Sequence, residues 1–284
     1  MTILTAKVFL FALLLTASIS TLFYIVLYPL QGNNDIENKP ETCQRVEEKL
    51  NKSLFFDKIY VIHLERRDDR KERMTKLFKQ LNLDYTFFPA IDADSNEVET
   101  YYQQTNGTLH RAAIACWLSH LKVYQTIVDN RLQNALIFED DIDMEMDIEE
   151  QLRVITQHLP RYWEMLYIGH CSQENLREPY NHPNLYISTR PSCTHAYAVS
   201  FIGAWLLLRE LANVVYPIDV ELVQLIEPGK IKSFSIEPPL AAQWRDGVPS
   251  DVSVNDPLYI PYYLNNSTLK YLNIIEYPSF DSSD

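Results

Sequence analysis

Glycine is scarce in this chain, with only six among 284 residues. Neither GxGxxG nor GxxxxGK[ST] occurs, and both motifs need glycines so that backbone N–H groups can approach a phosphate closely. This argues against a dinucleotide-dependent enzyme and against a P-loop kinase. Basic residues are also the minority, with 25 Lys and Arg against 38 Asp and Glu and a formal net charge of −13. This balance argues against nucleic acid as a partner, because its phosphates need a basic face.

Cysteine is also rare, with four in the chain. No two of them have CxxC spacing, and no Cys/His spacing predicts a zinc site. Cys171 and Cys193 flank a loop that contains several prolines and could form a disulfide in an oxidising compartment, although the sequence leaves the pairing open. Cys116 lies in an apolar helical pattern and is expected to be a buried free thiol.

One long uncharged segment lies near the N-terminus, from Val8 to Tyr28. Its length suits a membrane span, which needs about 20 apolar residues. Lys7 precedes it and Asp35 is the first charge after it, so the positive-inside rule places the N-terminus in the cytosol. We expect an uncleaved signal anchor, with a cleaved signal peptide as the alternative. Either one sends residues 31–284 into the secretory pathway, in agreement with four N-x-Ser/Thr sequons, at Asn51, Asn106, Asn265 and Asn266.

The rest of the chain alternates short apolar runs with helical patterns, which predicts an α/β domain. Strands are expected at 58–64, 84–93, 135–138, 164–169, 196–200 and 231–236, and helices at 68–81, 109–128, 147–158 and 203–213. Such alternation favours a mostly parallel sheet with helices on both faces. The predicted organisation is a cytosolic tail (1–7), a transmembrane helix (8–28), a stem (29–56), a single folded domain (57–256) and an irregular tail (257–284).

Three adjacent carboxylates, Glu139, Asp140 and Asp141, follow the apolar run at 135–138. In an open α/β sheet, ligands bind beyond the carboxyl ends of the strands. Adjacent carboxylates repel one another unless a cation joins them, and Mg²⁺ and Mn²⁺ prefer carboxylate oxygen. Alternation along the strand points the first and third to the same side, so a divalent-metal site is predicted there. A solvated acidic turn is the alternative, although the run lacks the Gly, Asn or Pro typical of turns.

The segment 111–143 resembles the central signature of glycosyltransferase family 25, in which a Cys-x-x-Ser-His-Leu helix precedes an apolar strand ending in Glu-Asp-Asp. This family includes the lipooligosaccharide and the procollagen galactosyltransferases. Further segments resemble the family in the expected order, namely 58–74, 87–93, 193–208, 218–222 and 243–251. The resemblance covers roughly residues 57–252, which makes it far more specific than any single motif.

The resemblance implies a GT-A (Rossmann-like) fold and inverting transfer of a hexose, galactose first, from a UDP-sugar to a hydroxyl of a glycan or glycoprotein. It also implies Mn²⁺ or another divalent cation, held by Glu139 and Asp141. Donor-binding roles fall on five residues: Arg66, Arg70, His120, Asp140 and Gln243. An inverting transfer needs a general base, for which the resemblance offers Asp219 and Asp251. The predicted location is the membrane of the Golgi or endoplasmic reticulum, with a single-pass type II topology and a lumenal domain.

This sequence departs from the family pattern in several places. His63 stands where the family usually has Asn, and Arg111-Ala112-Ala113 replaces a usual Gly-Glu pair. These departures favour an alternative, a non-catalytic lumenal module that binds a glycan or a partner protein, whereas the intact carboxylates favour the enzyme. A metal-dependent phosphohydrolase is a further alternative, but IFEDDIDM lacks the Thr or Val of the usual DxDx[T/V] motif.

Overall fold

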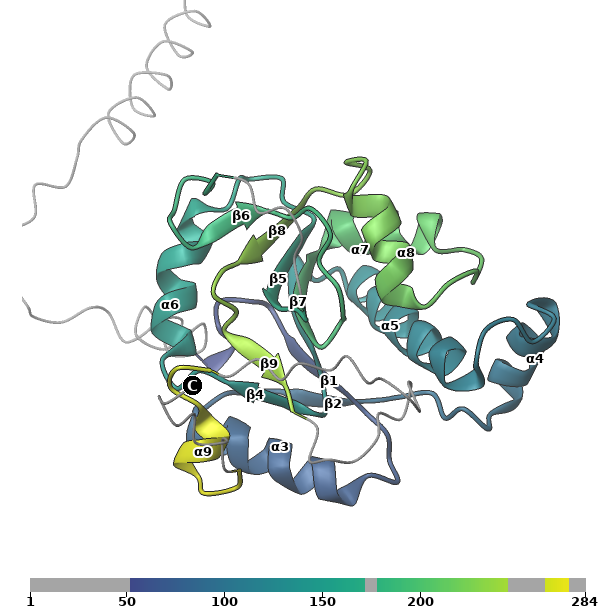
Figure 1. Cartoon of the computed structure of the whole chain (residues 1–284), viewed down its shortest axis with the longest axis horizontal. Helices are drawn as coiled ribbons and strands as arrows, with labels where there is room; N and C mark the ends of the chain where they lie inside the picture. Colours follow the sequence, from purple (N-terminus) through teal and green to yellow (C-terminus); the bar gives the residue numbers. More distant parts are fainter. Residues whose placement is uncertain (1–51, 172–177, 245–263, 276–284) are drawn as a thin grey trace, which may run out of the picture. The chain divides into compact units, whose positions relative to one another are not determined.

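The computed structural model of the chain describes residues 52–171, 178–244 and 264–275 (Figure 1). The predicted cytosolic tail and transmembrane helix, most of the stem, and Asp251 lie outside these ranges. Across the three ranges, no helix combines the length and the apolar character that crossing a membrane requires. Leu54 and Phe56, within the predicted stem, are buried in the core of the domain.

A seven-stranded sheet forms the centre of the domain, in the order β2-β1-β3-β7-β5-β8-β6. Its strands are β1 (Ile59–His63), β2 (Thr86–Pro89), β3 (Asn134–Glu139), β5 (Met165–Gly169), β6 (Leu185–Ile187), β7 (Ala196–Ser200) and β8 (Ser233–Ile236). All six strands expected from the apolar runs are present, and β6 is an addition.

The sheet is mixed, so the prediction of a mostly parallel sheet was wrong. β1 runs parallel to β2 and β3, and β5 runs parallel to β8. β7 is antiparallel to both β3 and β5, and β6 is antiparallel to β8. A parallel neighbour needs a long crossover, usually through a helix. Between β5 and β7 the described residues contain only the short strand β6, so nothing there provides a helical crossover.

Helices cover both faces of the sheet, as predicted (Figure 1). One face packs against α4 (Asn96–Gln104), α5 (Arg111–Asp129), α7 (Phe201–Glu210) and α8 (Ile218–Ile226). The other face packs against α3 (Asp68–Gln80), α6 (Ile148–Ile155) and α9 (Thr268–Tyr271). A short 3-10 helix, η1 (Thr156–His158), follows α6. Alternate residues of each strand therefore enter different cores; in β1, Tyr60 and Ile62 enter one core and Ile59 and Val61 the other.

Helix α5 follows from its apolar stripe, which predicted a helix over 109–128. Ile114, Trp117 and Leu118 of this stripe are buried, and so are Val123 and Ile127 elsewhere on the helix. Helix α4 was not predicted. It begins after Ser95, whose hydroxyl accepts the backbone N–H of Val98, and Val98 is the only fully buried residue on this short helix.

Part of the C-terminal region is ordered, so the prediction of an irregular tail over 257–284 was wrong for residues 264–275. The side chain of Leu269 in helix α9 packs into the core. The buried carboxylates of Asp143 and Glu145 hold this segment, because they accept hydrogen bonds from Ser267 and from the backbone N–H groups of Asn265 and Asn266.

A two-stranded antiparallel sheet, β4 (Ile142–Met144) with β9 (Ala241–Gln243), lies beside the main sheet. The register pairs Ile142 with Gln243. This brings the end of β9 against the residue that follows the carboxylate cluster. Strands of three residues carry almost no period in the sequence, which explains why neither was predicted.

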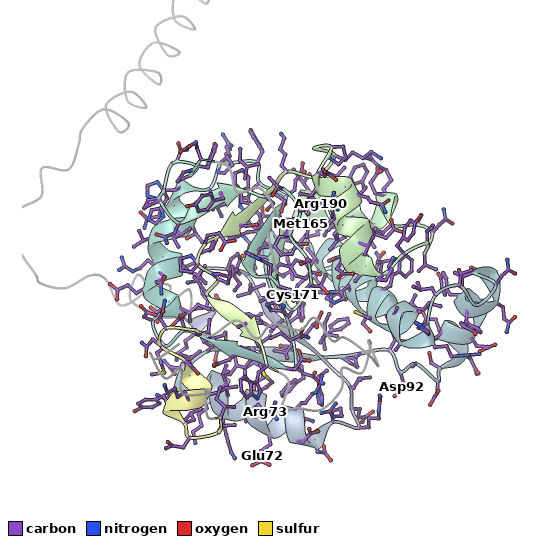
Figure 2. All side chains as sticks on the ribbon, viewed as in Figure 1. Glu72, Arg73, Asp92, Met165, Cys171 and Arg190 are labelled. Carbon is purple, nitrogen blue, oxygen red and sulfur yellow. A yellow bond between two sulfur atoms is a disulfide. The ribbon has the colours of Figure 1, made fainter. Side chains whose placement is uncertain are left out.

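Cys171, which is labelled in Figure 2, forms a disulfide with Cys193, and their two Cα atoms are 5.6 Å apart. It closes a sequence separation of 22 residues between β5 and β7. Cys116 is a free thiol and is half-buried.

Removal of this disulfide is expected to lower the free energy of unfolding by about 3 kcal/mol, because the unfolded chain then loses a constraint on a loop of this length. The measurement is urea unfolding of the oxidised chain and of Cys171→Ser/Cys193→Ser. A reducing agent should destabilise the native chain to the level of the double variant and leave the double variant unchanged. An equal effect of reduction on both proteins would contradict the assignment.

Candidate active site

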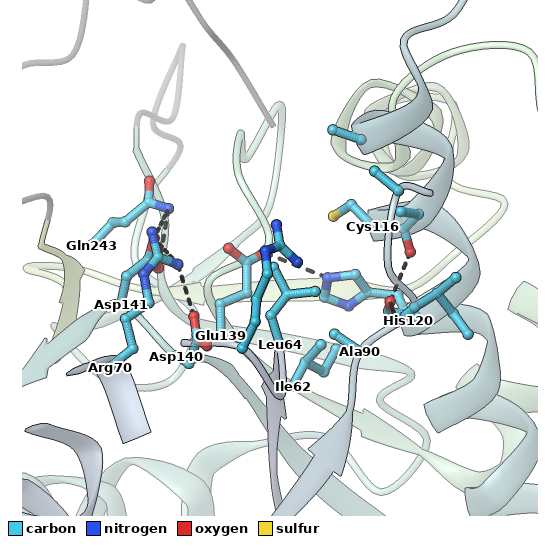
Figure 3. Close-up of a pocket in the computed structure, with 16 residues that line it drawn as sticks. Ile62, Leu64, Arg70, Ala90, Cys116, His120, Glu139, Asp140, Asp141 and Gln243 are labelled. Atoms are coloured by element: carbon cyan, nitrogen blue, oxygen red, sulfur yellow. Dashed lines mark hydrogen bonds and ion pairs between the residues drawn. The ribbon is translucent and has the colours of Figure 1, made fainter. Parts of the chain in front are cut away.

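A pocket opens at the carboxyl ends of β1 and β3, between α3, α5 and β9 (Figure 3). All of the predicted metal- and donor-binding residues line it, namely Arg66, Arg70, His120, Glu139, Asp140, Asp141 and Gln243. The rest of its lining is largely apolar and small, with Ala90, Ala93, Ala112 and Ala115 among its residues. Charged groups therefore lie beside a wall of short side chains.

Glu139 ends β3 and faces β7 and α5. Its Oε1 accepts a hydrogen bond of 2.8 Å from the Thr194 hydroxyl and lies 3.4 Å from Nε2 of His120. Burial acts to raise the pKa of this carboxyl, but His120, Thr194 and the charge of His195 outweigh burial and lower the pKa to about 2. Glu139 is therefore ionised at neutral pH.

Asp140 is paired on both of its oxygens. Oδ1 accepts from Nη1 of Arg70 at 2.8 Å, and Oδ2 lies 2.7 Å from Nδ1 of His63. All three side chains are buried. His63, which stands where the family pattern has Asn, is therefore a direct partner of the central carboxylate. A contact between Asp140 and a donor sugar stays a prediction.

Asp141 lies between Arg70 and Gln243. Nη1 of Arg70 is 3.2 Å from Oδ2, and Nε2 of Gln243 is 3.2 Å from each carboxylate oxygen. Burial raises the pKa of Asp141 to about 7, with the charges of Glu139 and Asp140 acting in the same direction against Arg70 and Gln243. Ionisation of Asp141 is therefore unfavourable in the folded chain.

The two predicted arginines differ in setting. Arg70 is buried, and both Asp140 and Asp141 hold its guanidinium at the edge of the pocket. Arg66 is about half exposed and forms an ion pair with Asp92. Arg66 therefore has the more accessible guanidinium for an incoming phosphate, and Arg70 neutralises part of the carboxylate charge.

His120 and Ser119 point into the interior from α5. Nδ1 of His120 lies 2.7 Å from the Tyr197 hydroxyl, which in turn lies 2.6 Å from the Tyr124 hydroxyl. The Ser119 hydroxyl donates to the Ala115 carbonyl and accepts the backbone N–H of Ile91, so it fixes the loop after β2 against α5. Ser119 thus has a structural role in this pocket.

The predicted general bases are less well defined. Asp219 begins α8 and is half-buried, and it is not among the described residues that line the pocket. Burial raises the pKa of Asp219, and the charge of Glu139 adds to this, while the backbone N–H groups of Val220 and Cys193 act to lower it. Asp251 lies outside the described residues. Both residues stay predicted candidates for the general base.

Thr194 was not assigned a role from the sequence, although its hydroxyl binds Glu139. It precedes β7, and β7 is the antiparallel neighbour of β3, so Thr194 arrives beside the end of β3. A sheet expected to be mostly parallel does not place these two residues together. The pairing of Arg70 with Asp140 could not be predicted from the sequence either, because helix α3 and strand β3 are far apart in the chain.

The chemistry of the carboxylate cluster suits a divalent cation. Glu139, Asp140 and Asp141 bring three formal negative charges, and Arg70 is the buried cation that pairs with two of them. Burial is the largest cause of the raised pKa of Asp141, and the charges of Glu139 and Asp140 add to it. Carboxylate oxygens are the ligands that Mn²⁺ and Mg²⁺ prefer, so the donor set matches such an ion.

Comparison with known families identifies the chain. The model of glycosyltransferase family 25 (LPS biosynthesis protein) matches residues 56–222, which is more than half of the chain. The chain belongs to glycosyltransferase family 25. The family implies a nucleotide-sugar donor and an acceptor. The match covers both β1 and β3, and therefore the carboxylates that line the pocket.

Curated relatives show how this family 25 chain compares in length. Procollagen galactosyltransferase 2 of Mus musculus is 26% identical over 70% of this chain and 37% of its own length. A glycosyltransferase 25 family member of Drosophila melanogaster is 30% identical over 65% of this chain and 31% of its own. The inactive glycosyltransferase 25 family member 3 of Homo sapiens is 26% identical over 66% and 36%. The chain thus spans about a third of the length of the curated relatives it matches.

Proposed function

We propose that the chain transfers a hexose, galactose first, from a UDP-sugar to a hydroxyl of a glycan or glycoprotein, with inversion at the anomeric carbon. The observation that carries this proposal is the carboxylate cluster at the end of β3, where two of three adjacent acids share one buried arginine. Such a surplus of negative charge is costly unless a cation occupies the site. Family membership supplies the sugar chemistry.

A divalent ion such as Mn²⁺, held by Glu139 and Asp141, would neutralise the charge that develops on the leaving diphosphate. Arg66, half exposed at the pocket, is placed to bind a phosphate oxygen through its planar guanidinium. Arg70 and His63 hold Asp140 from two sides and so keep the cluster in place. The wall of alanine side chains leaves room for the flat nucleobase.

The proposed location is the lumen of the Golgi or endoplasmic reticulum, with the chain anchored by its N-terminal segment in a single-pass type II topology. The disulfide between Cys171 and Cys193 supports this location, because disulfides persist in oxidising compartments. The net charge of −13 supports a partner other than nucleic acid.

A second candidate is a non-catalytic lumenal module that binds a glycan or a partner protein. One observation favours it: Asp140 accepts a hydrogen bond from Arg70, and Asp141 forms an ion pair with Arg70 and accepts from Gln243, so the cluster is partly satisfied without an ion. One relative in the family also carries the name of an inactive member.

The test uses the whole chain produced in an oxidising secretory host. UDP, UDP-galactose and UDP-glucose are titrated with and without Mn²⁺ by calorimetry, and slow hydrolysis of each donor is followed. We expect UDP binding that requires the metal and a preference for UDP-galactose. A folded chain that binds no UDP with Mn²⁺ present would overturn the transferase and leave the binding module.

A further inference from the structure

Three side chains with different metal-ligand atoms meet in the pocket (Figure 3). Cys116 and His120 come from α5, and Glu139 comes from the end of β3. The thiol sulfur, an imidazole nitrogen and a carboxylate oxygen all lie within 4.8 Å of one another. Residues four apart on a helix share one face, so α5 presents its cysteine and histidine together.

His120 is oriented as a metal-binding histidine is. Its side chain is 1% exposed, and its Nδ1 lies 2.7 Å from the Tyr197 hydroxyl. With a metal bound, the proton would be on Nδ1 and the lone pair of Nε2 would face Glu139. Without a metal, this buried nitrogen makes no hydrogen bond to the described residues, and it contacts Oε1 of Glu139 as an ion pair at 3.4 Å. Such a nitrogen needs an explanation, and histidine ligands are usually fixed through a hydrogen bond from the other ring nitrogen.

The spacing matches a tetrahedral ion. Nitrogen and oxygen ligands at about 2.0–2.1 Å from Zn²⁺ are about 3.3–3.4 Å from each other in a tetrahedron. Nε2 of His120 and Oε1 of Glu139 are 3.4 Å apart. The Thr194 hydroxyl, which donates to this oxygen, would orient the carboxylate. A mixed set of sulfur, nitrogen and oxygen suits zinc, whereas Mn²⁺ and Mg²⁺ favour oxygen ligands.

We propose that Cys116, His120 and Glu139 form a Zn²⁺ site whose fourth position opens to the pocket. On binding, the thiol proton of Cys116 passes to solvent as the zinc–sulfur bond forms. The inference does not depend on sugar transfer. Because Glu139 also belongs to the Mn²⁺ site of the proposed function, Zn²⁺ and Mn²⁺ are expected to compete.

Sequence spacing did not predict this site. Its two helical ligands have the spacing Cys-x-x-x-His. The third ligand is at the end of a strand, and the sequence pattern does not show that this strand end lies beside the helix. The site appears only when β3 is placed beside α5.

The test uses the full chain, freed of metal by a chelator and titrated with Co²⁺ as a spectroscopic probe for Zn²⁺. We expect one equivalent to produce a thiolate-to-cobalt charge-transfer band, which Zn²⁺ then bleaches. Cys116→Ser should lose the band and weaken Zn²⁺ binding by about 100-fold or more, since even the loss of an outer partner costs about 10–100-fold. His158→Gln, which alters an exposed histidine, is the matched control and should keep the band.

A second measurement needs no variant. Zn²⁺ should protect Cys116 of the native chain from alkylation by iodoacetamide, as followed on the Cys116 peptide by mass spectrometry. No protection, or equal Zn²⁺ affinity in Cys116→Ser, would overturn the site. Asp141→Asn should keep the cobalt band while losing UDP binding, so a failure of the zinc site and a failure of the proposed transferase give different results.

Discussion

Asp141→Asn is expected to abolish Mn²⁺-dependent UDP binding and, at the same time, to make the metal-free chain more stable at pH 8. The first effect follows from the loss of a proposed metal ligand with a full negative charge. The second follows from the environment of Asp141, where burial and two neighbouring carboxylates raise the pKa to about 7. One substitution therefore moves binding and stability in opposite directions.

The sign of the stability effect comes from linkage. The folded-state pKa of Asp141 is above the ordinary value of 3.8, so the unfolded chain gives up this proton more readily. The native chain therefore loses stability as the pH rises from about 4 to about 7. Asn carries no proton to lose, so the variant should gain about 1–3 kcal/mol over the native chain at pH 8, with a smaller gain near pH 4. Arg70 keeps its 2.8 Å contact with Asp140 in the variant.

Thermal unfolding at pH 4, 6 and 8, with and without Mn²⁺ plus UDP, measures both effects. Ligand at about 100 times its dissociation constant should stabilise the native chain by about 2.7 kcal/mol and the variant not at all. Asp143→Asn is the matched control. Its carboxylate accepts from Ser267 and from the backbone of Leu269, so its loss should lower stability and leave UDP binding intact. UDP binding by Asp141→Asn at the native affinity would contradict its role as a ligand.

The elements that the sequence predicted are those with a long apolar period. β1, β3 and α5 are examples, because each buries a continuous run or stripe of side chains. The elements that it did not predict are two nine-residue helices, α4 and α8, the four-residue helix α9 and three short strands. β4, β6 and β9 have three residues each, and pairing with a distant partner is what defines them. The order of the strands could not be predicted from the sequence pattern either, because the position of the antiparallel β7 between β3 and β5 depends on contacts across the sheet.

The candidate site shows the same division. Glu139, Asp140 and Asp141 were predicted because they interrupt an apolar run at a strand end. Their partners were not predicted, because His63 reaches them from β1 and Thr194 from the residues just before β7. Arg70 and Gln243 were expected at the donor through the family resemblance, and the structure instead shows both in contact with Asp141. Contact with a donor remains a prediction for both.

Gly169→Ala is expected to cost more than about 3 kcal/mol of stability, above the usual range for overpacking. Gly169 ends β5, where β9 and the start of β7 approach it. A Cβ there would lie 2.3 Å from the carbonyl oxygen of Ala241, 2.8 Å from Nε2 of His195 and 3.0 Å from Cβ of Ala196. The first and third of these atoms belong to strands β9 and β7 and cannot move without shifting the strands.

Gly169→Ala should also weaken metal-dependent UDP binding in the fraction of the protein that folds. Ala241 lies two residues before Gln243, which contacts Asp141, so a displaced β9 moves that contact. Gly229→Ala is the control, because a Cβ at Gly229 meets no atom within 4 Å. Its expected cost is the backbone strain of an alanine at a φ of +78°, about 1–2 kcal/mol. Urea unfolding of both variants separates the two costs. Equal losses in the two would show that β9 yields to the added methyl group, and that the close approach of β5 to β9 is not what holds Gln243 against Asp141.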